Sequence, residues 1–232
     1  MMAGQTIMQT DSTVSKQQNK IKKQQLTKPA VIAAPKNPTD LSWTRTDFPV
    51  LNQMINDKPL VYLDNAATAQ TPEVVIDAVS NFYKQDCSNI HRAVHQLGER
   101  STLLFENARK TVQLFLNAQR PEEIVFTRNT TEAINLVAHS FGKRFIKAGD
   151  EIVITMLEHH SNIIPWQMIA EQVGAKLVAV KLNELGEVDL EHYQSLLNEK
   201  TKIVSIVHVS NAIGTINPIK KMIDLAHQKD IP

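Results

Sequence analysis

The chain has 232 residues, of which 42% are hydrophobic, so it can bury one large core or two modest ones. Its formal net charge of +1 joins two unlike parts: residues 1–40 carry six Lys and two Asp, whereas the remainder carries 19 basic and 22 acidic residues. That slightly acidic remainder has no basic stripe for nucleic acid, and no apolar run approaches the ~20 residues that cross a membrane. We therefore expect neither nucleic acid nor a membrane as a partner.

The single cysteine, Cys87, excludes an internal disulfide framework and suits a reducing cytosol. The N-terminal segment is rich in Gln, Lys, Thr and Pro and has no periodicity, which predicts a disordered tail over residues 1–42. This tail lacks a signal-peptide core, and the absence of Arg before Arg45 argues against an organelle transit peptide. We expect a cytoplasmic protein, with organelle import as the open alternative.

Ordered structure is expected from Trp43 onward. The predicted parts are an anchoring segment at 43–60 and the first part of a larger domain at 61–232. Periodicity and helix-start signals predict the first elements in this order: a short strand at 60–63, a helix at 72–84 with Thr71 as its N-cap, a polar loop at 87–95 and a long helix at 97–116.

The long predicted helix carries one apolar face at helical spacing, which predicts a stripe against the core. The stripe consists of Leu104, Ala108, Val112 and Phe115. In the preceding loop, His91 and His95 have a four-residue spacing, but no metalloprotease pattern accompanies them. We expect both to lie near the rim of a pocket, with solvated side chains as the alternative.

From residue 123 onward, predicted strands and helices alternate strictly. The strands are at 123–127, 151–155, 176–182 and 202–209, and the helices are at 130–141, 163–173, 190–198 with Asp189 as its cap, and 218–227. A βαβ series with short connections predicts an α/β fold, a mostly parallel sheet with helices on both faces. Ligands of such sheets bind at the carboxyl ends of the strands.

Three of these strands are followed by polar side chains. Thr130 and Thr131 follow the first at a helix N-terminus, a place that binds phosphate, although Thr130 alone could merely cap the helix. His159 follows the second and could be a solvated cap, a metal ligand or an aromatic lid over a flat cofactor. Metal is disfavoured because neighbouring residues rarely converge on one ion. Asn211 follows the third and can both donate and accept hydrogen bonds.

Several motifs in one order closely resemble the SUF-type cysteine desulfurases, which belong to the class V aminotransferases and to the fold type I pyridoxal phosphate enzymes. The motifs are Asp47-Phe48-Pro49-Val50-Leu51, Tyr62-Leu63-Asp64-Asn65-Ala66-Ala67, His91-Arg92, Arg128-Asn129-Thr130-Thr131-Glu132, Glu158-His159-His160-Ser161-Asn162 with Pro165-Trp166, and His208-Val209-Ser210-Asn211 with Gly214-Thr215. The likeness covers about residues 43–232. It implies the incomplete large domain of a fold type I transferase that binds pyridoxal 5′-phosphate.

Carried over by position, the resemblance implies a role for each polar group. Thr130 and Thr131 would hold the cofactor phosphate, and Asn211 would bond the phenolic oxygen of its ring. His159 would stack on the ring and pass protons to the substrate. No metal site is implied.

A second group of residues is placed by the resemblance at the substrate entrance. This group consists of Ala66, His91 and Arg92, and the latter two would face the partner subunit of a homodimer.

The implied activity converts L-cysteine to L-alanine and passes persulfide sulfur to an acceptor protein for iron–sulfur cluster assembly. L-Selenocysteine lyase, another class V activity and a non-catalytic, partner-binding half-domain remain alternatives. The lysine that bonds the cofactor, the Asp that pairs with the ring nitrogen and the catalytic Cys have no counterpart here, since Cys87 lies too early in the family's order. We expect this chain to be the first part of a desulfurase and to be inactive alone.

Overall fold

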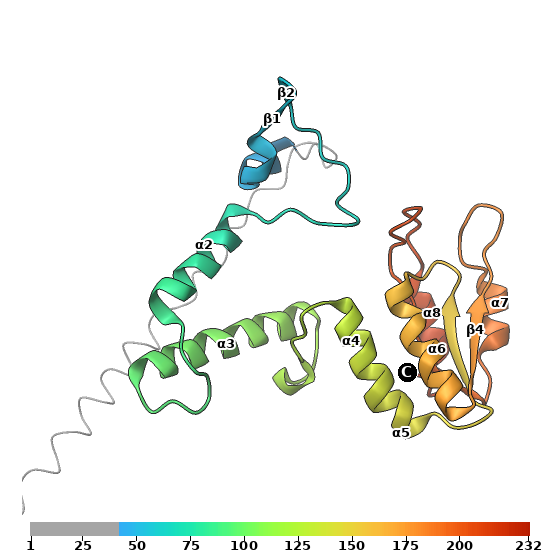
Figure 1. The fold of residues 1–232 in the computed structure, drawn as a ribbon. Helices are drawn as coiled ribbons and strands as arrows, with labels where there is room; N and C mark the ends of the chain where they lie inside the picture. The colour runs from blue at the N-terminus through green and yellow to red at the C-terminus, as the bar shows by residue number, and fades with distance from the viewer. Residues whose placement is uncertain (1–41) are drawn as a thin grey trace, which may run out of the picture.

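The computed structural model describes residues 42–232, so the predicted tail at 1–42 lies almost wholly outside the described residues. The described chain has two regions, which we call the arm (residues 42–127) and the sheet unit (residues 128–232). Figure 1 shows the sheet unit at the yellow-to-red end of the chain, with α2 and α3 of the arm standing away from it.

A three-stranded parallel sheet forms the centre of the sheet unit. Its strands are β3 (Glu151–Thr155), β4 (Lys176–Val180) and β5 (Thr201–Val204), in the order β4-β3-β5. Side chains alternate across a strand, so Ile152 and Val153 of β3 point to opposite faces, and both are fully buried. Each anchors a separate apolar cluster, one with Trp166 and the other with Tyr193. The prediction of a parallel sheet covered on both faces is confirmed.

The helices of the sheet unit pack on the two faces of the sheet. They are α4 (Thr130–Val137), the π-helical turn η5 (Ala138–Gly142), α5 (Lys143–Phe145), α6 (Ile164–Val173), α7 (Leu190–Leu196) and α8 (Ile219–His227). Asp189 caps α7 as predicted, because its carboxylate accepts from the His192 N–H at 2.9 Å. Gly174 ends α6 in the left-handed conformation, at φ 77°, which glycine adopts without strain. Beyond α8, the Val204 N–H donates to the Pro232 oxygen at 2.9 Å.

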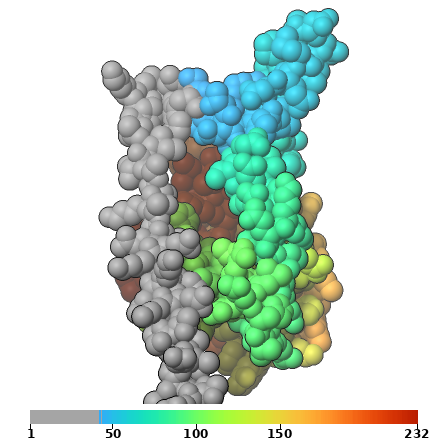
Figure 2. Space-filling view, turned by 90° about the vertical axis from the view of Figure 1, so that its left-hand side faces the viewer, coloured from blue at the N-terminus to red at the C-terminus, as the bar shows by residue number. Residues whose placement is uncertain are grey.

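The arm consists of short turns, a small hairpin and two helices. Its elements are η1 (Ser42–Asp47), η2 (Pro49–Asn52), β1 (Met54–Ile55), β2 (Lys58–Pro59), α2 (Glu73–Asn81), η3 (Phe82–Asp86), α3 (Gln96–Phe115) and η4 (Pro121–Glu123). The loop before α3 packs tightly on the helix, since a Cβ at Gly98 would lie 2.0 Å from the Ala93 Cβ. Figure 2 shows α2 and α3 as one continuous teal-to-green column.

Two predicted strands, 60–63 and 123–127, are wrong. Residues 60–63 and 124–127 form no ladder with any segment of the described chain, and residue 123 belongs to η4. A strand needs a neighbour that takes its hydrogen bonds, and the sheet unit offers these segments none. The predicted strand 202–209 is also too long, because the ladder between β3 and β5 ends at the pair Val153 and Val204, where β5 ends.

The structure corrects two predictions about the helices of the arm. Thr71 does not cap α2, because Pro72 keeps an extended backbone and the helix begins at Glu73 without a side-chain cap. The stripe on α3 does not face a core: Leu104 is 47% exposed and Phe115 is 87% exposed. Helical spacing alone cannot say whether a partner surface is present, and no described segment covers this face.

Candidate functional site

The first site residue, His159, lies in the turn that follows β3. It precedes the single turn η6 (His160–Asn162), and its side chain is exposed. The Ser161 N–H donates to His159 Nδ1 at 3.1 Å, and Ser161 Oγ lies 3.0 Å from the same atom. Because Nδ1 accepts the backbone bond, the neutral ring carries its proton on Nε2. The exposed ring is therefore held by one edge, and Nε2 can exchange a proton.

A buried polar network lies directly beneath this turn. The Glu158 carboxylate accepts from Thr155 Oγ1 at 2.6 Å, from Asn162 Nδ2 at 2.7 Å and from the Val207 N–H at 2.9 Å. The neighbouring Asn162 Oδ1 accepts from Trp166 Nε1 at 2.9 Å and from Ser205 Oγ at 2.6 Å. This network joins the ends of β3 and β5 to the start of α6.

Thr130 and Thr131 open α4, which packs beside η6. The hydroxyls and backbone N–H groups of both residues have no hydrogen-bond partner within residues 42–232. The cap is Asn129, whose side chain accepts from the Glu132 N–H at 2.9 Å, so the alternative that Thr130 caps the helix is wrong. Unpaired N–H groups and hydroxyls at a helix N-terminus fit the phosphate of a cofactor.

Two charged side chains stand at the same helix terminus. Arg128 donates to Glu132 through its backbone N–H at 2.6 Å and through its guanidinium at 3.1 Å. The side-chain bond from Arg128, followed by the backbone bond, lowers the pKa of Glu132. The Glu132 carboxylate is thereby turned back toward Arg128, the residue before the N-cap, whereas a capping box would use the N–H of the N-cap itself.

Asn211 lies in the turn that follows β5. The Ser210 N–H donates to the Thr215 oxygen at 2.9 Å, and the Gly214 N–H returns to the Ser210 oxygen at 3.0 Å. Gly214 closes this turn at φ 75°, a left-handed conformation that favours glycine. Ser210 is buried, whereas the Asn211 side chain is exposed and has no partner among the described residues. Its amide is free to bond a ring oxygen.

The structure brings four of the predicted residues to one edge of the sheet. The contact between Glu158 and Val207 ties the turn of His159 to the segment that leads to Asn211. The packing of α4 against η6 adds the helix that begins with Thr130 and Thr131. This edge offers an anion site, an exposed imidazole and an exposed amide, which together fit a phosphorylated aromatic cofactor.

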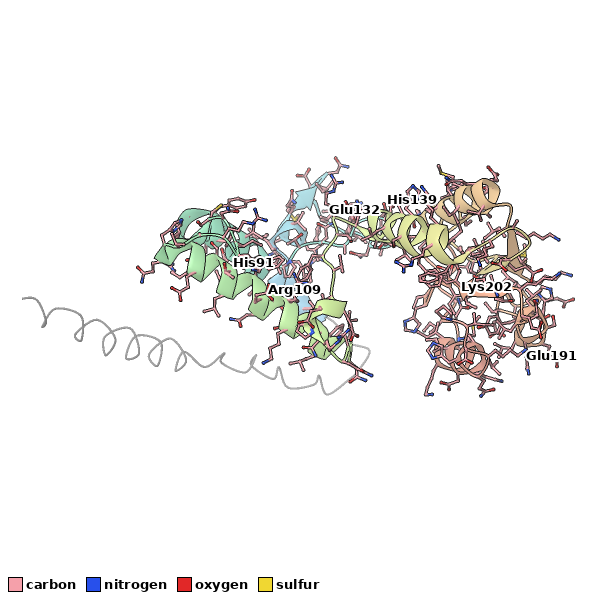
Figure 3. The ribbon with its side chains drawn as sticks, turned by 90° about the horizontal axis from the view of Figure 1, so that it is seen from below. His91, Arg109, Glu132, His139, Glu191 and Lys202 are labelled. Atoms are coloured by element: carbon pink, nitrogen blue, oxygen red, sulfur yellow. The ribbon has the colours of Figure 1, made fainter. Side chains whose placement is uncertain are left out.

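The other three predicted residues lie in the arm. Figure 3 shows His91 on the arm and Lys202 on the sheet unit, well apart from each other. The His91 backbone, at φ 64°, donates to Thr102 Oγ1 at 2.9 Å, and its ring Nε2 lies 3.3 Å from Glu106. Arg92 is exposed in the same loop, and Ala66 is exposed in the turn at 65–67. No described contact joins this group to the sheet edge.

An additional arginine fixes the loop region to the rest of the arm. The Arg109 guanidinium lies over the rings of Phe105 and Phe126, at 5.0 and 5.5 Å from their centroids. Its Nε lies 3.4 Å from Glu106, which also pairs with His91, and its Nη1 donates to the Ile124 oxygen. Sequence reasoning did not predict the role of Arg109, because two of its partners, Ile124 and Phe126, lie more than a dozen positions away along the chain.

Sequence reasoning also missed the Glu158 network and the Asn129 cap. The cap had a signal, since Asn129 and Glu132 have the spacing of a capping box. The spacing of Glu158 and Asn162 also places them within one local turn, but nothing local indicates Ser205 as their partner.

A parallel sheet with helices on both faces, and with exposed polar side chains at its carboxyl edge, defines an α/β protein of the kind whose ligands bind at that edge. The chain belongs to the class-V aminotransferase family, whose model, described as "Aminotransferase class-V", matches residues 61–232.

Known relatives bear cysteine desulfurase names. The chain is 53% identical over 191 residues to a probable cysteine desulfurase of Synechocystis sp., covering 82% of this chain and 46% of that protein. It is 50% identical over 184 residues to a cysteine desulfurase of Escherichia coli, covering 79% and 45%. The apo cysteine desulfurase from Thermococcus onnurineus NA1 has a TM-score of 0.75 at 38% identity, covering 82% and 46%. The chain thus spans about half the length of these relatives.

Among the described residues, no helix is both long and apolar enough to cross a membrane.

Proposed function

We propose that this chain supplies the cofactor-binding part of a pyridoxal 5′-phosphate-dependent cysteine desulfurase. The protein would convert L-cysteine to L-alanine and pass the sulfur, as a persulfide, to an acceptor protein for iron–sulfur cluster assembly in the cytoplasm. One observation carries the proposal: an anion-binding helix terminus, an exposed imidazole and an exposed amide lie at one edge of the sheet. Relatives that are 50–53% identical and named cysteine desulfurase support the choice of reaction.

Within this proposal, each residue at the edge has one task. Thr130 and Thr131 bind the cofactor phosphate through their hydroxyls and backbone N–H groups, and the Asn211 amide donates to the ring oxygen. The bound cofactor supplies an electron sink for the substrate's α-carbon. His159 covers the ring, and because its Nδ1 is held by Ser161, it exchanges protons with the substrate through Nε2.

The proposal gives the arm a separate task at the substrate entrance. Ala66, His91 and Arg92 lie away from the sheet edge, and the loop of His91 is held rigidly on α3. In a homodimer, His91 and Arg92 would face the edge of the partner subunit. The exposed apolar side chains of α3 support this part of the proposal, because obligate interfaces are apolar.

A titration with pyridoxal 5′-phosphate tests the phosphate-binding role. The chain's affinity is measured by cofactor absorbance, with inorganic phosphate as competitor. We expect Thr130→Ala/Thr131→Ala to weaken binding about tenfold to a hundredfold, since two hydroxyl bonds to a charged group are lost. The matched control is Thr111→Ala, which removes an exposed hydroxyl of α3 that bonds only its own helix. Equal affinity of the wild type and the double variant would refute the assignment.

A second measurement tests whether the 232-residue chain alone catalyses the reaction. We expect no alanine release from L-cysteine by the 232-residue chain with added cofactor, because this chain spans about half the length of the relatives that bear the desulfurase name. Release of alanine above a no-protein control would show that this chain alone is sufficient.

A further inference from the structure

The Glu158 carboxylate is buried without a cationic partner. It is 9% exposed, and no Lys, Arg or His between residues 42 and 232 forms an ion pair with it. Its three donors are the Thr155 hydroxyl, the Asn162 amide and the Val207 N–H. Burying an unpaired carboxylate is costly, so a role that needs only apolar packing would not favour this side chain.

The hydrogen bonds of Asn162 explain why both side-chain oxygens of residue 158 must be acceptors. Asn162 Oδ1 is occupied by Trp166 Nε1 and Ser205 Oγ, so the Asn162 amide must turn its Nδ2 toward residue 158. A carboxylate accepts there, whereas a Gln could present a nitrogen that also donates. The two acceptor oxygens of Glu158 therefore fix which way the Asn162 amide points.

Beyond the ends of β3 and β5, the Glu158 side chain accepts a hydrogen bond where the backbone ladder no longer does. The last ladder bond runs from the Ser205 N–H to the Val153 oxygen at 2.9 Å. Two residues later, the Val207 N–H donates to Glu158 Oε1 instead. His159 follows Glu158 directly, and Asn211 lies four residues after Val207. One buried side chain thus bridges the two segments that carry the imidazole and the amide.

We propose that Glu158 is a positioning residue, whose bonds to Asn162 and Val207 hold His159 and Asn211 at the spacing that the cofactor ring needs. The inference rests on the proposed function, because it concerns the two residues assigned to the ring. We also infer that the hydrogen-bond donors and acceptors of Glu158 and Asn162 must match each other, and that the packing of the two side chains in the core is not sufficient by itself.

The test uses the complete 232-residue chain and pyridoxal 5′-phosphate as the probe. We expect Glu158→Gln to raise the dissociation constant about tenfold, since a mismatched donor displaces the network. The swap variant Glu158→Gln/Asn162→Asp restores the match, because the new carboxylate can accept from the new amide, from Trp166 and from Ser205, and we expect affinity within about threefold of wild type. Glu171→Gln, an exposed carboxylate of α6, is the matched control and should bind as wild type.

Nitrogen-15 NMR separates positioning from general damage to the fold. The Trp166 indole N–H signal reports the Asn162 orientation, and the His159 ring signals report the held imidazole. Both should shift in Glu158→Gln. In the swap variant the His159 signals should return to their wild-type positions, whereas the indole signal should report a bond to the new carboxylate. Unchanged cofactor affinity in Glu158→Gln, or a folded swap variant that still binds weakly, would overturn the inference.

Two further outcomes also decide the question. If neither variant folds, Glu158 is required for the fold itself, and the positioning role is wrong. If the wild-type chain binds no cofactor, the proposed function fails, but the ring signals still decide: unchanged His159 signals in Glu158→Gln reject the positioning role, and shifted signals that the swap restores support it.

Discussion

The sheet unit and the arm are made from similar patterns but are stabilised very differently. In the sheet unit, Trp166 is 2% exposed and Tyr193 is fully buried, each in its own apolar cluster against β3. In the arm, α3 has an equally regular apolar face, yet Phe115 on that face is 87% exposed. Amphipathic patterning predicts that the apolar face of a helix packs against another surface. Whether the face is buried depends on a surface that the pattern does not contain.

Hydrogen exchange should show the largest difference between the two regions. We expect the amides of Ile152 and Val153 to exchange only through global unfolding, because both residues are paired with β4 on one side and with β5 on the other. The amides of α3 should exchange faster by orders of magnitude, since few tertiary contacts hold that helix. Exchange is measured residue by residue by NMR or mass spectrometry. Equal protection in α3 and β3 would mean that a surface covers the arm in solution.

The positions of secondary structure in the sheet unit were largely predictable, because its signals are local. Asp189 and the strand at 151–155 were recognised from caps and apolar runs, and the structure confirms both. The strands at 60–63 and 123–127 were wrong for a different reason. Their residues have strand-like composition, but pairing is a property of two segments, and no second segment of the described chain meets them.

The candidate site likewise has features that the sequence predicted and features that depend on contacts distant in the sequence. His159 and Asn211 each followed a predicted strand that the structure contains, and the rule for carboxyl ends of parallel strands placed both at one edge. Thr130 and Thr131 followed the predicted strand 123–127, which does not form, and their helix reaches that edge by packing against η6. The bond from Val207 to Glu158 spans 49 positions, so no local pattern could indicate it. Ala66 and Arg92 came only from the family resemblance, whereas His91 was also expected near a pocket rim from its place in a polar loop. The structure leaves all three in the arm.

Truncation of one aromatic side chain in each region compares their contributions to stability. We expect Trp166→Ala to lower the free energy of unfolding by about 3–5 kcal/mol, because it empties a buried site and removes the indole bond to Asn162. Phe115→Ala in the arm should change it by less than about 0.5 kcal/mol, because that ring is exposed. Urea denaturation followed by circular dichroism measures both. A comparable loss in Phe115→Ala would show that the exposed face of α3 is buried in solution.

Alkaline titration compares a buried with an exposed tyrosine. Burial raises the pKa of Tyr193 to about 12, and its hydroxyl donates to the Met222 oxygen at 2.8 Å. The folded state therefore holds the phenol proton more tightly than the unfolded state. Its stabilising effect is complete below the ordinary pKa of 10 and is lost as the pH rises toward 12.

We accordingly expect Tyr193→Phe to flatten the fall in unfolding free energy between pH 10 and 12, and to cost about 1 kcal/mol at neutral pH through the lost hydrogen bond. The control Tyr83→Phe alters a tyrosine of the arm that is 71% exposed and should keep the same alkaline fall as wild type. A fall that persists unchanged in Tyr193→Phe would assign it to other groups.

The smallest expected difference comes from removing one helix cap in each region. Asp189 accepts from the His192 N–H at 2.9 Å at the start of α7, and His95 accepts from the Gly98 N–H at 3.2 Å at the start of α3. We expect Asp189→Ala to lower the free energy of unfolding by about 1 kcal/mol, because α7 packs on the sheet and its fraying exposes the core. Urea denaturation measures this loss.

The corresponding change in the arm should leave global stability unaltered. His95→Ala removes the same kind of bond, but we expect it only to speed hydrogen exchange in the first turn of α3, because unfolding of that turn opens little buried surface. If His95→Ala instead destabilises the whole chain as much as Asp189→Ala does, the arm and the sheet unit unfold together. The exposed face of α3 would then have to be held by contacts that form in solution, most simply between two copies of the chain.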